Sequence, residues 1–479
     1  MKSFLLISLA FVLAWAAAAQ EWSTPVNVSN MEGQDRSPDF CIDGEGSIHC
    51  VWVHDYELNF AKIFYSRSID GGFTWTTPKD ISNNNEKMLG TPKIIPDSNN
   101  IIFVTYDFNT GNPSGTIILM KTFDGISWSA ADTITPEMPG SRHSKLVIDQ
   151  NNRLYCFWYH DMNNGTTFYK YFENNVWSET MAAYPGNHYQ TIMKLVCDAT
   201  NKMHCIAKYH AVGENHNKDR LVYFNMLDNT WSSLEEISKP TEGPGEDIDI
   251  DSYSVPHVAF MQESPITPPN NDSTVYIHLV GTNWTEPELV VEDPRHQRIL
   301  IDEYDKPNIF DIEKTEDGCM LVHHYKLNNQ WEGCVVGTSP WNTTHYSVLN
   351  RKKTLFLIYN KPTTNNEADL FFTKTDIVSS INKEKQISTF DKLQLFPNPF
   401  TDFISIQFNL DMPGFVTVKI YSLKGELINT LLSQKLVSGK CRVVWDGKDK
   451  NGNETASSVY LVRIIADKNI ITRSIEKIN

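Results

Sequence analysis

A short pattern returns seven times along this chain of 479 residues and constrains its fold more than any other feature. Each copy has a polar start, a mostly apolar run and a closing Asp or Asn, which we call the marker residue. The copies are RSPDFCID (36–43), GTPKIIPD (90–97), RHSKLVID (142–149), TIMKLVCD (191–198), PGEDIDID (244–251), RHQRILID (295–302) and TTHYSVLN (343–350). Their spacing of 48 to 54 residues predicts one supersecondary unit per copy.

A series of tryptophans repeats with the same period. Its members are Trp22, Trp75, Trp128, Trp177, Trp231, Trp284 and Trp331. A period of about 40 to 50 residues is typical of a four-stranded propeller blade. The sequence therefore predicts an all-β protein whose main domain is a seven-bladed β-propeller. Because the last repeat has only three strand-like runs and no Trp, we expect EWSTPVNVS near the start of the chain to supply its fourth strand.

The start of the chain and its charge limit its location and its partners. Residues 1–19 have the pattern of a secretory signal peptide, with Lys2, an apolar stretch, and Ala17 and Ala19 at a cleavage site. No later stretch has the roughly 18 apolar residues of a membrane helix, so we expect no membrane span. A formal net charge of -16 argues against nucleic acid as a partner, because phosphate binding needs a basic surface.

Eight cysteines in an exported chain permit disulfides, but the repeat favours packing for several of them. Cys50, Cys156 and Cys205 all lie seven positions after a marker residue, where a small buried side chain fits. Three pairs could instead bridge neighbouring strands: Cys41 with Cys50, Cys197 with Cys205, and Cys319 with Cys334. In a common register at most one of the first two pairs is expected to close.

The pattern of the chain changes near residue 380. The propeller is predicted over residues 20–379, a polar linker over 380–390, and a small immunoglobulin-like β-sandwich over 391–479. One loop of the sandwich could hold a calcium ion through Asp446, Asp449, Asn451, Asn453 and Glu454. A turn between two strands explains these residues at least as well. No other cofactor is predicted.

This last domain resembles the C-terminal sorting domain of the type IX secretion system of Bacteroidetes. The resemblance is carried by FPNPF (396–400), VKIYSLKGELI (418–428) and VYLVRIIADKNIITRSI (459–475). It implies that the type IX secretion machinery is a partner. It also implies export across the outer membrane, after which the protein is secreted or attached to the cell surface.

The segment SIDGGFTW (68–75) has the pattern S-x-D-x-G-x-T-W through Ser68, Asp70, Gly72 and Trp75. It resembles the Asp-box, or BNR repeat, of sialidase-like propellers, and FDGISW (123–128) is a degenerate second copy. Asp and Gly make a tight turn between the third and fourth strands, so we interpret these residues as structural. The resemblance implies that a ligand binds on the opposite face.

Arginines recur at the start of the predicted first strands, on the face opposite this turn. Arg36, Arg142 and Arg295 occupy equivalent positions, and His143 and His296 follow two of them. Guanidinium groups around a ring mouth suit a carboxylate, because each donates two parallel hydrogen bonds. The sequence therefore predicts an acidic glycan, containing uronate or sialate, as the ligand. Pairing of these arginines with Asp residues of neighbouring blades is the structural alternative.

His, Tyr and Asp recur at the predicted ends of the second strands. They are His54, Asp55, Tyr106, Asp107, His160, Asp161, Tyr209, His210, Tyr359 and Asn360. The order and types of residue around them resemble seven-bladed polysaccharide lyases, in which His and Tyr transfer protons and Arg neutralises the uronate. The resemblance implies catalytic roles for His160, Tyr209 and His143. The predicted substrate contacts are Arg36, Arg142, Arg295, Arg220, Asp55, Asp107 and His210.

Two other functions remain open at this point. A non-catalytic surface adhesin would use the same rim for recognition alone. A sialidase would need an arginine triad and a Tyr nucleophile with a Glu partner, and Arg36-Ser37-Pro38 departs from that family's aromatic-Arg-Ile-Pro motif. The acidic run of Glu246, Asp247, Asp249 and Asp251 could hold a cation or balance the arginines. We favour the second interpretation, and no metal site is predicted.

Overall fold

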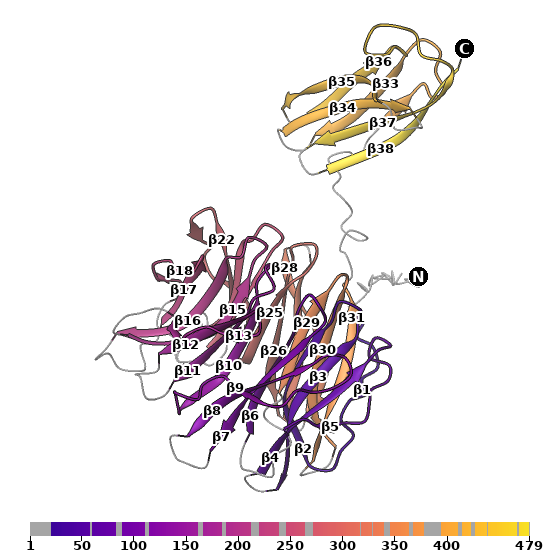
Figure 1. Ribbon diagram of the computed structural model, residues 1–479. Coiled ribbons are helices and arrows are strands. Elements are labelled where there is room, and N and C mark those ends of the chain that lie inside the picture. Colours follow the sequence, from indigo (N-terminus) through magenta and orange to yellow (C-terminus); the bar gives the residue numbers. More distant parts are fainter. Residues whose placement is uncertain are drawn as a thin grey trace, which may run out of the picture. The chain divides into compact units, whose positions relative to one another are not determined.

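The chain forms two compact units, residues 1–378 and 379–479, in the computed structural model (Figure 1). The structure describes residues 21–57, 60–82, 89–110, 115–160, 166–183, 188–211, 220–238, 246–263, 272–316, 318–327, 329–339, 345–363, 367–377, 394–410, 414–422, 427–437, 439–466 and 469–478. All regular elements among these residues are β-strands, which confirms the all-β prediction. The predicted signal peptide and linker lie outside them.

The first unit consists of small groups of antiparallel strands in chain order, one group for each sequence repeat, and a parallel pair, Gln34 with Ala368, joins the first and last groups into one eight-stranded sheet. The first three groups are β2 (Gln34–Ile42), β3 (Ile48–Glu57), β4 (Phe60–Ser68) and β5 (Lys79–Asp80); β6 (Leu89–Pro96), β7 (Ile102–Asn109), β8 (Thr116–Phe123) and β9 (Asp132–Thr133); and β10 (Ser141–Ile148), β11 (Leu154–His160), β12 (Thr167–Glu173), β13 (Val176–Trp177) and β14 (Met181–Ala182).

The next three groups have the same order of strands. They are β15 (His188–Cys197), β16 (Met203–Ala211), β17 (Arg220–Leu227), β18 (Thr230–Trp231) and β19 (Glu235–Glu236); β20 (Glu246–Ile250), β21 (Pro256–Glu263), β22 (Asp272–Val280), β23 (Asn283–Trp284) and β24 (Glu288–Glu292); and β25 (Pro294–Ile301), β26 (Pro307–Thr315), β27 (Gly318–Leu327) and β28 (Gln330–Ser339).

The last group joins the two ends of the first unit. It contains β29 (Tyr346–Arg351), β30 (Thr354–Pro362), β31 (Ala368–Asp376) and the N-terminal β1 (Val26–Asn27). Val26 pairs with Phe372 of β31, which confirms that EWSTPVNVS supplies a strand to the last repeat. The first strands contact one another in the order β2, β6, β10, β15, β20, β25 and β29, and β29 contacts β2. The series of groups therefore closes on itself.

The marker Asp folds the turn between the first and second strands of a group. The Asp43 carboxylate accepts hydrogen bonds from the backbone N–H groups of Glu45 and Ser47, at 3.0 and 2.8 Å. The same pair of bonds forms at Asp97, Asp149, Asp198, Asp251 and Asp302. Asp side chains commonly form such turns, so the recurrence of this residue has a structural cause.

The segment at residues 68–75 forms a tight turn through its own side chains. The Asp70 carboxylate accepts the hydroxyl of Ser68 at 2.8 Å and the backbone N–H of Thr74 at 2.9 Å. Gly72 has a φ of +94°, and a Cβ atom there would lie 2.0 Å from the Phe372 ring. Glycine is therefore needed for both its backbone and the space beside it. These contacts agree with the structural interpretation of the segment.

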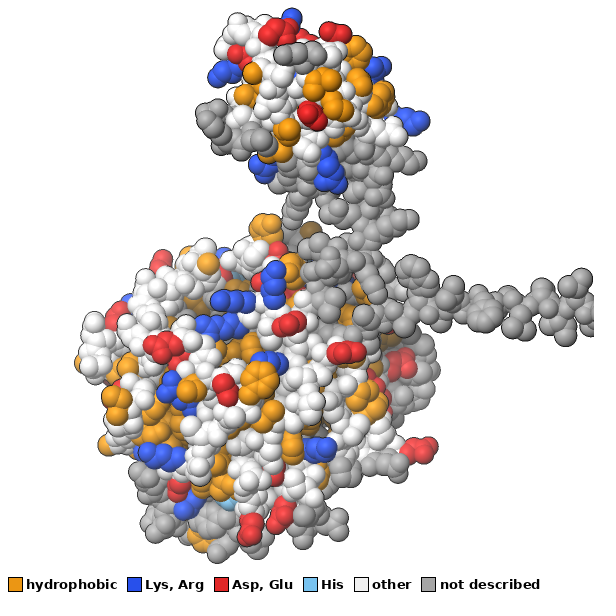
Figure 2. Space-filling view, turned by 90° about the vertical axis from the view of Figure 1, so that its right-hand side faces the viewer, with side chains coloured by type: hydrophobic (Ala, Val, Ile, Leu, Met, Phe, Trp, Pro, Cys, Tyr) orange, Lys and Arg blue, Asp and Glu red, His pale blue; other side chains and the backbone are white. Residues whose placement is uncertain are grey.

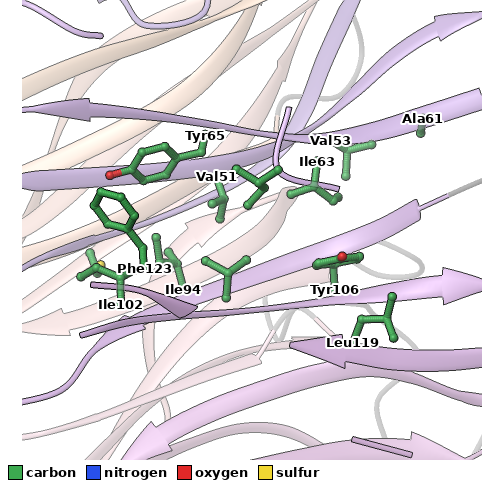
Figure 3. Close-up of a cluster of buried hydrophobic side chains, with 13 residues drawn as sticks. Val51, Val53, Ala61, Ile63, Tyr65, Ile94, Ile102, Tyr106, Leu119 and Phe123 are labelled. Carbon is green, nitrogen blue, oxygen red and sulfur yellow. The ribbon is translucent and has the colours of Figure 1, made fainter. Parts of the chain in front are cut away.

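Neighbouring groups bury apolar side chains between them. Figure 3 shows one such cluster, in which Val51 and Ile63 of the first group lie close to Ile94, Tyr106 and Leu119 of the second. The packing interpretation of the cysteines is confirmed, because Cys50, Cys156 and Cys205 are fully buried. All eight cysteines are free, so none of the three candidate disulfides is formed.

The second unit contains two antiparallel sheets with a common core. One sheet has β32 (Gln394–Phe396), β33 (Ile404–Leu410) and β36 (Gly439–Trp445); the other has β35 (Leu427–Leu436), β34 (Gly414–Ser422), β37 (Ser458–Ala466) and β38 (Asn469–Lys477). In the loop considered for calcium, Asp449 accepts the N–H groups of Asn451 and Asn453, both at 2.9 Å. Glu454 pairs with Lys477 at 2.8 Å. These bonds support the interpretation of this loop as a turn.

Candidate functional site

A bulge interrupts most of the first strands near their start. The register with the second strand shifts between Arg36 and Asp39, Gly90 and Lys93, Arg142 and Lys145, Ile192 and Lys194, and Arg295 and Arg298. In four of these bulges a residue other than glycine has a positive φ: Ser37 (50°), Thr91 (30°), His143 (57°) and His296 (60°). Such backbone is uncommon, and bulges often re-aim side chains beside binding sites.

The bulged segments line a cavity of about 620 Å³ where the first strands meet. Its wall contains three histidines, His143, His296 and His345, and four cations, Lys93, Lys145, Lys194 and Arg298. It also contains the carboxylates of Asp39, Glu246 and Asp247. This concentration of charged groups in one cavity makes it the candidate functional site.

Carboxylates form ion pairs with two of the four cations. Lys93 lies 3.7 Å from Asp39, and Lys194 lies 3.4 Å from Asp247. Among the residues that the structure describes, no ion pair involves the other two. Lys145 donates to the His143 carbonyl at 3.4 Å, and Arg298 donates to the Gln297 carbonyl at 2.8 Å. These two cations are therefore available to a negatively charged ligand.

The cations of the cavity repel one another. Burial, together with the neighbouring cations, lowers the pKa of Lys145 to about 8. Burial and nearby arginine charges also lower the pKa of His296 and of His345, which favours their neutral imidazoles. An anion bound in the cavity would relieve this repulsion. By contrast, acidic and basic side chains are interspersed over the face of the first unit that Figure 2 shows.

His143 and Asp107 are two predicted site residues that the structure brings together at the cavity. The backbone N–H of His143 donates to both oxygens of the Asp107 carboxylate at 3.1 Å, and the Thr91 hydroxyl adds a bond at 2.9 Å. The His143 Nδ1 atom lies 4.0 Å from Asp107 Oδ2. Burial raises the pKa of Asp107 to about 6. An imidazole in a cavity wall beside a carboxylate has the composition of a general acid or base.

The three predicted arginines are not among the residues of the cavity wall. Arg36 forms two hydrogen bonds with Asp55, at 2.5 and 3.1 Å, which is a partner within its own group. The Arg142 guanidinium lies over the Tyr159 ring, 5.9 Å from its centre. Arg295 pairs with Ile312 across β25 and β26. Contact of these arginines with a substrate stays a prediction.

His160, Tyr209 and Arg220 also lie outside the cavity wall. His160 is buried, and its Nε2 atom lies 3.1 Å from the Pro139 carbonyl oxygen. Tyr209 pairs with Arg220 across β16 and β17, and Arg220 lies 3.5 Å from Glu236. Asp161 and the side chain of His210 are outside the described residues. The proposed proton transfer by His160 and Tyr209 therefore stays a prediction.

The sequence interpretation missed the cations of the cavity, although the repeat contains a signal for them. Lys93, Lys145, Lys194 and Arg298 each stand four positions before the marker residue of their repeat. Asp39 and Asp247 occupy the same position in two other repeats. The position is charged in six copies of the pattern, but its sign changes from copy to copy.

Comparison with known families identifies the second unit. The family model of the secretion system C-terminal sorting domain matches residues 394–477. No curated protein matches the chain. Among the residues that the structure describes, none belongs to a helix with the length and hydropathy of a membrane span.

Several solved structures are similar to this chain at low sequence identity. The polysaccharide lyase Uly1 is 8% identical with a TM-score of 0.50, and the match covers 76% of this chain and 94% of that one. An ulvan lyase with a bound saccharide is 10% identical with a TM-score of 0.49, covering 73% and 93%. A protein of unknown function from Dyadobacter fermentans is 9% identical with a TM-score of 0.47, covering 75% and 100%.

More distant structural similarity extends to a sialidase and to an arabinanase. At these identities the matches leave the activity of the first unit open. The assignment of the second unit is specific. Residues 394–477 are a type IX secretion system C-terminal sorting domain, and the protein is exported across the outer membrane to be secreted or attached to the cell surface.

Proposed function

We propose that the first unit is a seven-bladed β-propeller that binds an acidic glycan, containing uronate or sialate, in the cavity where its first strands meet. The observation that carries the proposal is the pair of cations, Lys145 and Arg298, that line this cavity and form no ion pair among the described residues. One group of strands per repeat and the closed series of first-strand contacts support the number of blades.

The chemistry of the cavity suits a sugar acid better than a neutral sugar. A hydrogen bond to a charged group contributes roughly 1.5–3 kcal/mol, and more of this is realised where water is excluded. Neutral imidazoles such as those favoured at His296 and His345 both donate and accept hydrogen bonds, as sugar hydroxyls require. A cavity of about 620 Å³ is in the range of small-ligand sites.

A binding panel with the full chain tests this proposal. Oligosaccharides that contain uronate or sialate are compared with the same oligosaccharides after reduction of their carboxyl groups to alcohols. We expect at least one acidic oligosaccharide to bind. Its reduced form should bind more weakly, by roughly tenfold or more. Equal binding of both forms, or no binding of any acidic member, would contradict the proposal.

Catalysis is the second candidate, and it is supported by the position of His143 in the cavity wall beside Asp107. In an elimination from a uronate, a base removes the C5 proton while the bond to the leaving oxygen at C4 breaks. The unsaturated product absorbs ultraviolet light, which gives a direct assay. We expect His143→Ala to abolish this signal while acidic oligosaccharides still bind. Binding without any product from the unmodified chain would instead identify a surface adhesin.

A further inference from the structure

A compact group of metal-ligating side chains lies on the sixth group of strands, apart from the cavity wall. Asp311 and Glu313 are two residues apart on β26, so they share one face, and His324 lies on the paired strand β27. Asp311 is fully buried, His324 is buried and Glu313 is half-buried. One ligand atom from each of the three residues lies within 4.8 Å of the others.

The distances within this group fit a shared ion. His324 Nε2 lies 3.2 Å from Asp311 Oδ1 and 3.3 Å from Glu313 Oε1. Charge-assisted N–H to carboxylate hydrogen bonds are usually shorter, about 2.7–2.9 Å. Two ligands bound tetrahedrally to zinc at about 2.0–2.1 Å are separated by about 3.3 Å. The two distances from His324 Nε2, of which the one to Asp311 is also a hydrogen bond, therefore match the separation of two ligands on one zinc ion.

A second and separate observation points to the same place. Gln297 is fully buried, and neither its carboxamide oxygen nor its nitrogen has a hydrogen-bond partner. Arg295 pairs with Ile312 and Arg298 pairs with Phe310, so the bulge places Gln297 opposite Asp311. A buried amide without partners is costly, and the carboxamide oxygen of Gln297 could bind an ion held at Asp311.

The other carboxylate oxygen of Asp311 accepts a hydrogen bond from a neighbouring group of strands. The Thr274 hydroxyl of β22 donates to Asp311 Oδ2 at 3.3 Å. Such a bond orients a metal-binding carboxylate while its other oxygen stays directed at the ion. The contact also means that an ion at this place would stabilise the join between the fifth and sixth groups.

We propose that Asp311, Glu313 and His324 bind one divalent transition-metal ion, zinc by its ligand chemistry, with the Gln297 carboxamide beside it. One imidazole and two carboxylates suit zinc and its neighbours in the first row, whereas calcium takes six to eight oxygen ligands. His296, in the same bulge as Gln297, lines the cavity. The ion therefore lies behind the cavity wall and fixes the bulge that shapes it. This inference does not depend on the proposed glycan ligand.

Metal analysis of the full chain without an affinity tag tests the proposal. The protein is stripped with a chelator, incubated with zinc, dialysed and measured by mass spectrometry of its metal content. We expect roughly one retained zinc ion per chain, with at least about 100-fold weaker binding in His324→Gln and in Glu313→Gln. Zinc should also raise the thermal midpoint of the stripped chain but of neither variant.

The matched control is Glu332→Gln, because Glu332 is an exposed carboxylate on the neighbouring strand β28. It should retain zinc like the unmodified chain. A protonated His324 between two carboxylates is the competing explanation, and it predicts no zinc retention and no midpoint shift. Either of those results, or equal zinc retention by His324→Gln, would overturn the proposal. Glu313→Gln removes a half-buried group and serves as the test variant if His324→Gln does not fold.

Discussion

The two ends of the first strands differ in how strictly their residues recur. At the turn end, six groups use the same Asp, which accepts the same two backbone N–H groups. At the bulged end, four positions earlier, the residue is Asp39, Lys93, Lys145, Lys194, Asp247 or Arg298. Every group must make its own turn, whereas a ligand in the shared cavity meets each group once. Recurrence therefore marks the scaffold, and variation at one position marks the proposed site.

The largest effect on stability is expected at the turn end. Asp198 accepts backbone N–H groups from Thr200 and Lys202, and its second oxygen lies 3.2 Å from His204 Nε2. Replacement by Ala removes the acceptor of both turn N–H groups and leaves the Nε2 atom of the buried His204 without this partner, so we expect Asp198→Ala to lower the free energy of unfolding by about 2–4 kcal/mol. Chemical denaturation followed by tryptophan fluorescence measures the change.

The exposed residue Asp132 provides the control for this prediction. Asp132→Ala should change the free energy of unfolding by less than about 0.5 kcal/mol. Glycan affinity should be nearly the same in both variants under conditions where they are folded. If Asp198→Ala were as stable as the unmodified chain, the recurring Asp would not stabilise the fold, and the distinction between scaffold and site would be wrong.

A smaller effect, on binding alone, is expected at the bulged end as pH changes. Because the pKa of Lys145 is lowered to about 8, its side chain is positively charged below about pH 8 and loses this charge as the pH rises through that value. Affinity for an acidic glycan should therefore fall above about pH 8, by at most about tenfold per pH unit. Lys145→Arg keeps its charge over this range and should bind with little dependence on pH. A similar fall in both proteins would show that another group controls binding.

The parts of the fold that follow from local patterns were predictable from sequence. The period located each group, the marker Asp located the turns, and the missing strand of the last repeat located the pairing of Val26 with Phe372. Each of these rests on bonds between residues that are close in sequence or equivalent in the repeat. Burial of Cys50 followed from the same alignment.

The site was harder to predict because similar side chains near the ends of the second strands do not stand at equivalent positions. Asp55 stands twelve positions after its marker residue and Asp107 stands ten after its own, so Asp55 pairs with Gln34 and Asp107 pairs with Gly90. Arg36 is held by Asp55 of its own group, whereas the structural alternative had expected an Asp of a neighbouring blade. Recurrence drew attention to arginines, whereas the cavity uses cations such as Lys145 that vary in type. The group around His324 combines two strands and has no sequence pattern of its own.

Calorimetric titration of an acidic oligosaccharide into paired variants tests the central claim most directly. Lys145→Ala and Arg298→Ala remove cations from the cavity wall, whereas Arg142→Ala removes a recurring arginine outside it. We predict that each of the first two weakens binding by roughly tenfold or more and that Arg142→Ala has a smaller effect than either. Loss of binding in Arg142→Ala, with Lys145→Ala and Arg298→Ala unaffected, would contradict the assignment of the site to the variable position.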